Sequence, residues 1–373
     1  MRVLRRIALV LAAPVLAIVF SLAVTSIVLL TIKASPLDTF RTMFDYAMQP
    51  RTQVLIINSA VTYYFAAVAV AVGFRMNLFN IGVDGQYRLA AMLAASVGGA
   101  VTLPAPLHVG LILVTAMLVG GLWAAVAAVL KVRRGVSEVI STIMLNFVAT
   151  GLIAYLLAPG RLAVTTQGSN NLGTKPIPPS GQVPGISLVP GTQAQVYGLI
   201  VLAVIVGVAF WFVLNRTRFG FDLRATGMSE AAAVASGVDV RRMVVAAMVI
   251  SGAVAGLVGM PQLLGASYTY SLDFPAGLGF TGIAIALLGR NNPVGIAVGC
   301  LLWGFLDNSA QILNLQDIPV EIVQITQGVI VLSVVVAYEL VRRYRVVAEQ
   351  RDVARALAAT TPQAAAVAEG AQS

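Results

Sequence analysis

The chain has 373 residues, of which 58% are hydrophobic and 10% are charged, and its formal net charge is +9. Because soluble domains average about 25% charged residues, this composition excludes an ordinary soluble protein. The single cysteine, Cys300, excludes a disulfide within the chain, and the single histidine, His108, excludes a two-histidine metal site within it. Basic residues do not interleave with aromatic ones on a polar surface, so we expect no nucleic-acid partner.

Apolar runs recur along the chain and predict an all-α polytopic membrane protein, because a backbone in lipid must satisfy its own hydrogen bonds. The run that follows the basic start MRVLRR is too long for a cleaved signal peptide, so we interpret it as an uncleaved first span. The eighth and ninth runs are too short to cross alone at about 1.5 Å per residue, so we interpret them as half-helices or tilted pieces. About ten spans are predicted, at residues 7–32, 54–73, 78–101, 107–130, 137–158, 195–214, 243–264, 277–289, 293–306 and 319–340.

The distribution of basic residues predicts the orientation. With the N-terminus in the cytoplasm, most of the 24 lysine and arginine residues fall in segments that face inside, and both termini are cytoplasmic. We therefore predict a single transmembrane domain over residues 1–345. Its loop 159–194 faces outside and its loop 215–242 faces the cytoplasm. Residues 346–373 are predicted to form a cytoplasmic tail that is partly disordered.

An internal repeat is predicted, with spans two to five and seven to ten as its two halves. Each half contains a stretch interrupted by glycine and asparagine, FNIGVDGQ at 79–86 and FTGIAIALLGRNNPVG at 280–295. Paired interruptions at corresponding places are the best pointer in a sequence to a transport site. We expect the first of them to break a helix at the translocation pathway.

An ionisable residue within a span costs about 2.5–3.5 kcal/mol and is a functional candidate by default. Asp84 is such a residue and can pair with Arg88 on the same helix face. Two interpretations remain open, namely a structural ion pair near the cytoplasmic boundary and direct contact with the transported molecule. Other polar residues within spans can serve the pathway or act as hydrogen-bonded contacts between helices. The candidate pathway or gate residues are Asn80, Asp84, Gln86, Arg88, Asn146 and Gln262.

The cytoplasmic loop predicts one short helix. Ser229 can cap its start, Glu230 suits its first turn, and Gly237 can close its end. An isolated helix of about two turns is unstable in water, so it must pack against another surface. Its alanine-rich face suits insertion into a groove of a partner protein. The alternative is a surface turn packed on its own protein.

Together these features resemble the permease subunits of bacterial ABC importers of the branched-chain amino-acid, ribose and simple-sugar group. FNIGVDGQ and the segment SGAVAGLVGMPQLLG (251–265) are most similar to the nucleoside permeases, of the guanosine type, whose usual form has Glu in place of Asp84. The resemblance covers roughly residues 50–340 and implies a permease domain in the bacterial cytoplasmic membrane. It also implies three partners besides membrane lipid: a second permease, favoured to be a paralogue, a P-loop ATPase, and an extracytoplasmic substrate-binding lipoprotein.

The resemblance assigns the short loop helix to coupling with the ATPase. The residues concerned are Ser229, Glu230, Ala231, Ala232 and Gly237. The usual motif has three residues between the second alanine and the glycine, whereas here four residues separate Ala232 from Gly237. The docking register of the helix is therefore open.

The residues themselves exclude an ATP site of the P-loop type in this chain. Such a site needs a lysine after a glycine, and none of Lys33, Lys131 and Lys175 follows one. The chain is thus expected to be a transport subunit without a cofactor, with ATP and Mg in the partner ATPase. We expect nucleosides as the substrate, from the resemblance alone. Ribose or another simple sugar is the alternative, followed by an ion-coupled secondary transporter.

Overall fold

A computed structural model describes residues 18–165, 172–316, 318–334, 336–337 and 339–340, together with the single positions 343, 347 and 350. The chain forms two compact units. One combines the residues up to 37 with those from 319 onward, and the other is Asp38–Ile318. Residues 7–17 of the first expected span and residues 351–373 of the expected tail lie outside the described residues.

The first unit contains the helices Ile18–Thr31 and Glu321–Val334. Their contact includes two hydroxyl pairs. The hydroxyl oxygens of Thr25 and Thr326 lie 2.9 Å apart, and the Ser21 hydroxyl donates to that of Ser333 at 3.4 Å. All four side chains are buried. Polar contacts of this kind join helices where the surroundings are apolar.

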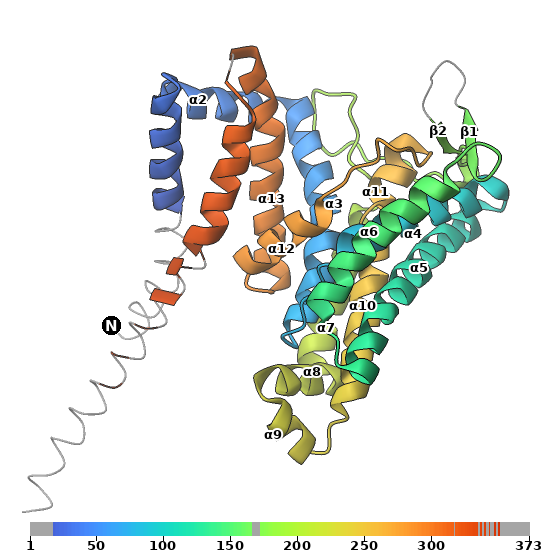
Figure 1. Cartoon of the computed structure of the whole chain (residues 1–373). Helices are drawn as coiled ribbons and strands as arrows, with labels where there is room; N and C mark the ends of the chain where they lie inside the picture. Colours follow the sequence, from blue (N-terminus) through green and yellow to red (C-terminus); the bar gives the residue numbers. More distant parts are fainter. Residues whose placement is uncertain are drawn as a thin grey trace, which may run out of the picture. The chain divides into compact units, whose positions relative to one another are not determined.

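The second unit holds the remaining elements, apart from the first two residues of α2, which belong to the first unit (Figure 1). In chain order they are α2 (Pro36–Ala47), α3 (Pro50–Phe74), α4 (Val83–Ala100), α5 (Ala105–Arg134), α6 (Glu138–Leu156), β1 (Ala163–Thr165), β2 (Leu172–Thr174), η1 (Pro179–Gly181), α7 (Ile200–Arg216), α8 (Arg218–Met228), α9 (Glu230–Ala235), α10 (Val240–Gly256), α11 (Met260–Gln262), η2 (Leu263–Ser267), α12 (Leu278–Leu288), α13 (Pro293–Ser309) and η3 (Ala310–Gln316).

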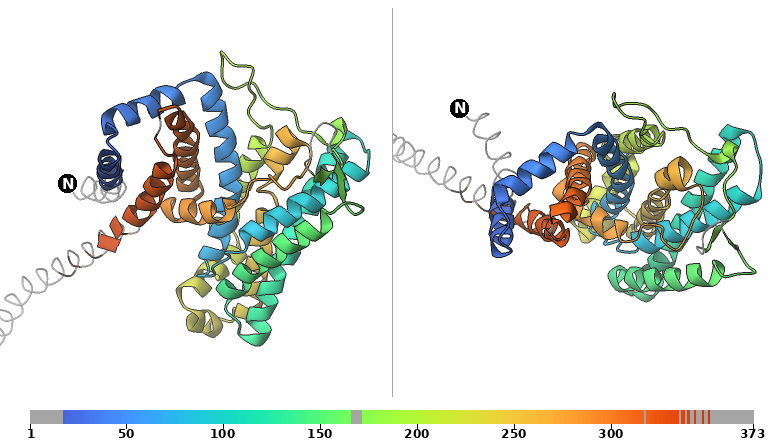
Figure 2. Two further views of the ribbon diagram at one scale, coloured as in Figure 1. Left: turned by 45° about the horizontal axis from the view of Figure 1, so that its top comes forward. Right: turned by 90° about the horizontal axis from the view of Figure 1, so that it is seen from above.

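Helix α3 is the centre of this unit, because α10, α12, α13 and α7 all pack against it. Helix α5 runs along α10 and α4, and α6 covers α4 and α5, as the views of Figure 2 show. Helices α8 and α9 lie at one end of the unit and the β1–β2 hairpin lies at the other (Figure 1). Most residues of α3 from Phe65 to Gly73 are fully buried, which places the core along this helix.

Helices α5 and α10 approach each other backbone to backbone. A Cβ atom added at Gly120 would overlap the carbonyl oxygen of Gly252, and one added at Gly256 would overlap that of Ala116. Small residues allow this close approach. In lipid there is no hydrophobic driving force between helices, so the van der Waals packing that the approach permits helps to hold them together. The crossing fixes α10 against α5.

The helices confirm a polytopic helical membrane protein in outline. Each of the ten expected ranges contains a described helix. By length and apolar composition, however, 5 of the described helices could cross a membrane, or up to 7 if each bent pair is one span. The ten-span count and the side on which the termini lie stay predictions. The five are Pro50–Phe74, Ala105–Arg134, Glu138–Leu156, Val240–Ser267 and Pro293–Gln316.

Two expected boundaries are wrong. The ninth range is not a short piece, because α13 continues through η3 to give a span of 24 residues, Pro293–Gln316. The third range does not begin at residue 78, because the chain is not helical before Val83. Helix α12, with 11 residues, is as short as expected.

The loop expected outside is hydrogen-bonded to the segment that includes η2 and the residues after it. The backbone N–H groups of Thr174 and Ile177 donate to the carbonyl oxygens of Tyr270 and Tyr268, each at 2.9 Å. Further on, the N–H of Val183 donates to the carbonyl of Leu264 at 2.8 Å. This part of the loop therefore covers the irregular segment that leads from η2 to α12.

Candidate functional site

The polar stretch 79–86 forms a buried amide cluster. The side-chain amides of Asn80 and Gln86 bond each other in both directions, at 3.0 and 2.9 Å. Asn80 also donates to the hydroxyl of Ser251 on α10 at 2.9 Å, and that hydroxyl donates to the carbonyl of Ala69 on α3 at 2.6 Å. The start of α4 is thereby tied to both α10 and α3.

Asn146 ties the same region to α6. Its Oδ1 accepts from the backbone N–H of Gly85 at 2.8 Å, and its Nδ2 donates to the carbonyl of Ile81 at 2.9 Å. A Cβ atom at Gly85 would lie 2.8 Å from Oδ1 of Asn146, so glycine is needed for this approach. The structure thus brings together Asn80, Gln86 and Asn146 from the sequence-based candidates.

Asp84 lies where two helices begin. Its Oδ1 accepts from the backbone N–H of Gly277, the residue before α12, at 2.7 Å. A Cβ atom at Gly279 would lie 2.6 Å from the Asp84 nitrogen, so the first turns of α4 and α12 are in contact. Each helix start carries a partial positive charge, and a carboxylate placed between them compensates both.

Arg88 is partnered only in part. Its Nη1 lies 3.9 Å from Oδ2 of Asp84, as the spacing predicts, and donates to the Thr150 hydroxyl at 3.2 Å. Its Nε is buried and has no hydrogen-bond partner among the described residues. The neighbouring Tyr87 hydroxyl donates to the carbonyl of Pro275 at 2.6 Å, which fixes the chain that leads into α12.

Gln262 does not join this cluster. It ends the short helix α11, and the next turn, Leu263–Ser267, is a π-helix. Among the described residues its side chain makes no hydrogen bond, and its carbonyl accepts from the Ser267 hydroxyl. Its place among the pathway candidates stays a prediction.

A polar contact between α3 and α13 was missed by the sequence analysis. The Tyr63 hydroxyl donates to Oδ2 of Asp307, and Nδ2 of Asn308 donates to the Ser59 hydroxyl at 3.0 Å. Because α13 continues to Gln316, Asp307 lies within the candidate span rather than at its end. The adjacent Asp and Asn in an apolar run were the available signal.

The predicted short helix is present as α9. The Ser229 hydroxyl accepts from the N–H of Ala232 at 3.3 Å, which caps its start. At its end Gly237 has φ +84°, and the N–H of Val238 donates to the carbonyl of Ala233 at 3.0 Å. This is the Schellman pattern that favours glycine.

The surface of α9 is divided between its own protein and solvent. Ala233 is buried against the chain, whereas Glu230, Ala231 and Ala232 are exposed. The exposed part therefore offers small side chains next to one carboxylate.

Helix α8 precedes α9 and was not predicted. The signal was Thr217, whose hydroxyl accepts from the N–H of Gly220 at 3.1 Å and caps the helix. At its other end, the carbonyl of Gly227 accepts from Nδ2 of Asn77 at 2.6 Å. Helix α8 thus contacts the chain just after α3.

The same segment after α3 reaches the turn between α12 and α13. Nη2 of Arg75 donates to the carbonyl of Asn291 at 2.6 Å. Burial, and then the nearby Arg224 guanidinium, lowers the pKa of Arg75 from its usual range. The contacts run from α9 through α8 and residues 75–77 to the end of α12, the helix that meets Asp84 at its start.

Comparison with known proteins shows which family the chain belongs to. Residues 53–335 match the family described as branched-chain amino acid transport system / permease component. A guanosine ABC transporter permease of Bacillus subtilis is 34% identical over 331 residues, covering 88% of this chain and 93% of the relative.

Two further relatives have similar coverage. A glucose ABC transporter permease of Haloferax volcanii is 31% identical, over 89% of both chains. A nucleoside ABC transporter permease of Lactococcus lactis is 29% identical over 87% of this chain and 90% of its own. Bacillus subtilis and Lactococcus lactis each also have a second similar permease of the same substrate name.

Proposed function

The chain belongs to the branched-chain amino acid transport system / permease component family, and from this premise we propose that it is the membrane-spanning subunit of an ATP-driven nucleoside importer. The guanosine and nucleoside permeases among its relatives support this substrate. The glucose permease supports the alternative, a simple sugar such as ribose or glucose. The relatives are transport subunits, so the chemistry of ATP belongs to another protein.

The observation that carries the mechanism is the contact between the starts of α4 and α12 through Asp84. The contact joins the first interrupted stretch, residues 79–86, to Gly277 and Gly279, which directly precede the second stretch at 280–295. We assign Asp84 and Arg88 to a gate that holds the segment before α12 against α4. Asn80, Gln86 and Asn146 position this gate, because their hydrogen bonds anchor the start of α4 to its neighbours. Transport requires this contact to open and close.

In this proposal the ATPase drives that movement by acting on α9. The exposed residues Glu230, Ala231 and Ala232 dock on the ATPase, and Ser229 and Gly237 fix the two ends of the helix. The contacts of Asn77 and Arg75 described above lead from α8 to the α12–α13 turn. A displacement of α9 is thereby passed to the end of the helix whose start meets Asp84.

The proposed partners are a second permease, a P-loop ATPase and an extracytoplasmic substrate-binding lipoprotein, all at the bacterial cytoplasmic membrane. The two similar permeases in Bacillus subtilis and in Lactococcus lactis support pairing with a paralogue. The second permease would complete the pathway from its own side.

A tagged pull-down from gently solubilised native membranes tests this assignment. Mass spectrometry of the co-purifying proteins is expected to identify a P-loop ATPase and a second permease. Recovery of the chain alone, reproducibly and in mild detergent, would contradict the proposal and favour an ion-coupled transporter.

A further inference from the structure

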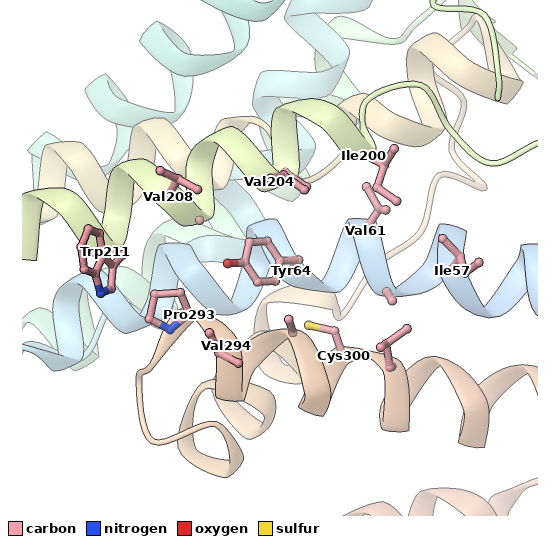
Figure 3. Close-up of a pocket in the computed structure, with 15 residues that line it drawn as sticks. Ile57, Val61, Tyr64, Ile200, Val204, Val208, Trp211, Pro293, Val294 and Cys300 are labelled. Atoms are coloured by element: carbon pink, nitrogen blue, oxygen red, sulfur yellow. The ribbon is translucent and has the colours of Figure 1, made fainter. Parts of the chain in front are cut away.

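A cavity of about 580 Å³ lies on the surface of the second unit, between α3, α7 and α13 (Figure 3). Its sides are formed by hydrocarbon side chains, including Val204 and Val208 of α7 and Val294 of α13. These three are 62%, 61% and 73% exposed, so the cavity is a groove that opens to the outside of the unit. We refer to it as the α7–α13 groove.

The α7–α13 groove lacks the chemistry of a nucleoside site. Among the described residues, the polar side-chain atoms on its lining belong to Tyr64, Trp211 and Cys300, and none of these lining residues carries a carboxylate, amide or guanidinium. A hydroxyl-rich substrate would leave most of its hydrogen bonds unmade there, and an unmade hydrogen bond of a buried polar group disfavours binding. The lining favours a hydrocarbon occupant.

The length of the groove matches one leaflet of a bilayer. Along α7 its lining runs from Ile200 to Trp211, as Figure 3 shows, which at about 1.5 Å per residue is roughly 17 Å. Half of the hydrocarbon core of a membrane is about 15 Å. A single acyl chain of a phospholipid therefore fits from the interface toward the midplane.

Glycine gives the groove its shape at mid-length. A Cβ atom at Gly207 would overlap the hydroxyl oxygen of Tyr64, so the tyrosine can lie against α7 only because residue 207 has no side chain. Larger residues at 207 would push the ring into the space between the helices. The groove thus depends on a small residue placed opposite a large one.

One end of the groove carries positive charge. Arg216 lies in the last turn of α7, with its guanidinium 5.8 Å from the ring of Trp211, and it is exposed. Arg290, also exposed, precedes the lining residue Pro293 by three positions. Tryptophan and arginine at one level are typical of a membrane interface, and a juxtamembrane basic residue attracts anionic lipid by about 1 kcal/mol.

We propose that the α7–α13 groove binds one acyl chain of an anionic phospholipid, whose phosphate lies at Arg216 and Arg290. The positive-inside rule assigns this end to the cytoplasmic leaflet, where anionic headgroups attract basic segments. The bound lipid fills the gap between α7 and the α3–α13 pair. It is a site for lipid, separate from the transported molecule.

The test uses the full chain with its co-purified partners in nanodiscs of phosphatidylcholine and phosphatidylglycerol. The probe is phosphatidylglycerol with a diazirine in one acyl chain, and crosslinked peptides are identified by mass spectrometry. Crosslinks are expected on α7 and α13 at the groove. Ala297→Phe, which fills the groove from α13, abolishes them, whereas Val298→Phe, on the exposed side of the same helix, leaves them unchanged.

The charge is tested by competition between the two lipids. Arg216→Gln is expected to reduce the preference for phosphatidylglycerol about fivefold, the factor that corresponds to about 1 kcal/mol. Arg133→Gln, at the end of α5, is the matched control and leaves the preference unchanged. Equal labelling of the two phenylalanine variants, or equal preference in the two glutamine variants, overturns the proposal. Absence of lipid crosslinks at the groove in the unsubstituted chain, the result expected if a second permease covers it, overturns the proposal as well.

Discussion

Asp84 is a single side chain on which two helices depend. One carboxylate oxygen accepts from the backbone of Gly277, and the other lies near Arg88. The aspartate is buried, so both interactions occur where water competes little. Substitutions of Asp84 can therefore separate the effect of its charge from the effect of its hydrogen bond to Gly277.

Asp84→Asn keeps an oxygen that can accept from Gly277 but loses the charge, whereas Asp84→Ala loses both. We expect the asparagine variant to insert normally and to transport less. The alanine variant should lose transport and also stability, because a hydrogen bond to a charged group contributes about 1.5–3 kcal/mol. Uptake normalised to the amount of inserted protein measures the difference. Parallel loss of uptake and expression in Asp84→Asn would make the residue structural only.

The amide cluster gives a second prediction for single residues. Asn80→Ala leaves the buried side-chain amide of Gln86 without its partner, at a cost of about 1–3 kcal/mol. It also removes the donor to the Ser251 hydroxyl, which keeps its bond to the carbonyl of Ala69. We expect a lower thermal unfolding midpoint of the purified chain.

Asn215→Ala is the control, because Asn215 is exposed and its two hydrogen bonds, to the carbonyl of Trp211 and from Arg224 at 3.4 Å, lie at the surface. Equal midpoints in both variants would show that the cluster adds no stability.

At the level of elements, the crossing of α5 and α10 depends on its glycines. Gly120→Ala places a methyl group against the backbone of α10 and should separate the two helices. We expect a clearly lower unfolding midpoint, since backbone in a packed core cannot yield without cost. Gly110→Ala on the same helix is the control, because nothing lies within 4 Å of its added Cβ. If both variants unfold alike, the close approach is not a source of stability.

The end of α9 depends on Gly237, which has a positive φ. Gly237→Ala strains this turn by about 1 kcal/mol or more and should misplace the helix on its partner. We expect ATP hydrolysis to continue while uptake per ATP falls. Gly135 ends α5 and also has a positive φ, +66°. Gly135→Ala is therefore the matched control for backbone strain alone. The same loss of coupling in both variants would remove the special role of α9.

Much of this element structure could be predicted from sequence, because it depends on local signals. Ser229 and Gly237 mark the two ends of α9, and the spacing of Asp84 and Arg88 indicates their pairing. The bond from Asp84 to Gly277 could not be predicted, since the residues are 193 positions apart. The extension of α13 through η3 was missed because Asp307 appeared to end the apolar run, whereas Tyr63 satisfies its carboxylate.

At the scale of the molecule, the second unit has two different ends. The short helices α8 and α9 occupy one end and the β1–β2 hairpin occupies the other (Figure 1). The segment before α12 is covered by residues 172–183 at one side and meets α4 at the other. The proposed function requires such an arrangement, with a receiving end at the hairpin, a driven end at α8 and α9, and the proposed gate between them.

The most direct measurement is uptake of labelled guanosine into proteoliposomes that contain this chain, its co-purified permease and ATPase, and the binding protein. The account predicts uptake that requires ATP and that excess unlabelled nucleosides inhibit, while ribose and glucose do not. Uptake driven by an ion gradient without ATP would contradict the assignment to an ATP-driven importer. ATP-dependent uptake that ribose or glucose abolishes would keep the importer and contradict its substrate.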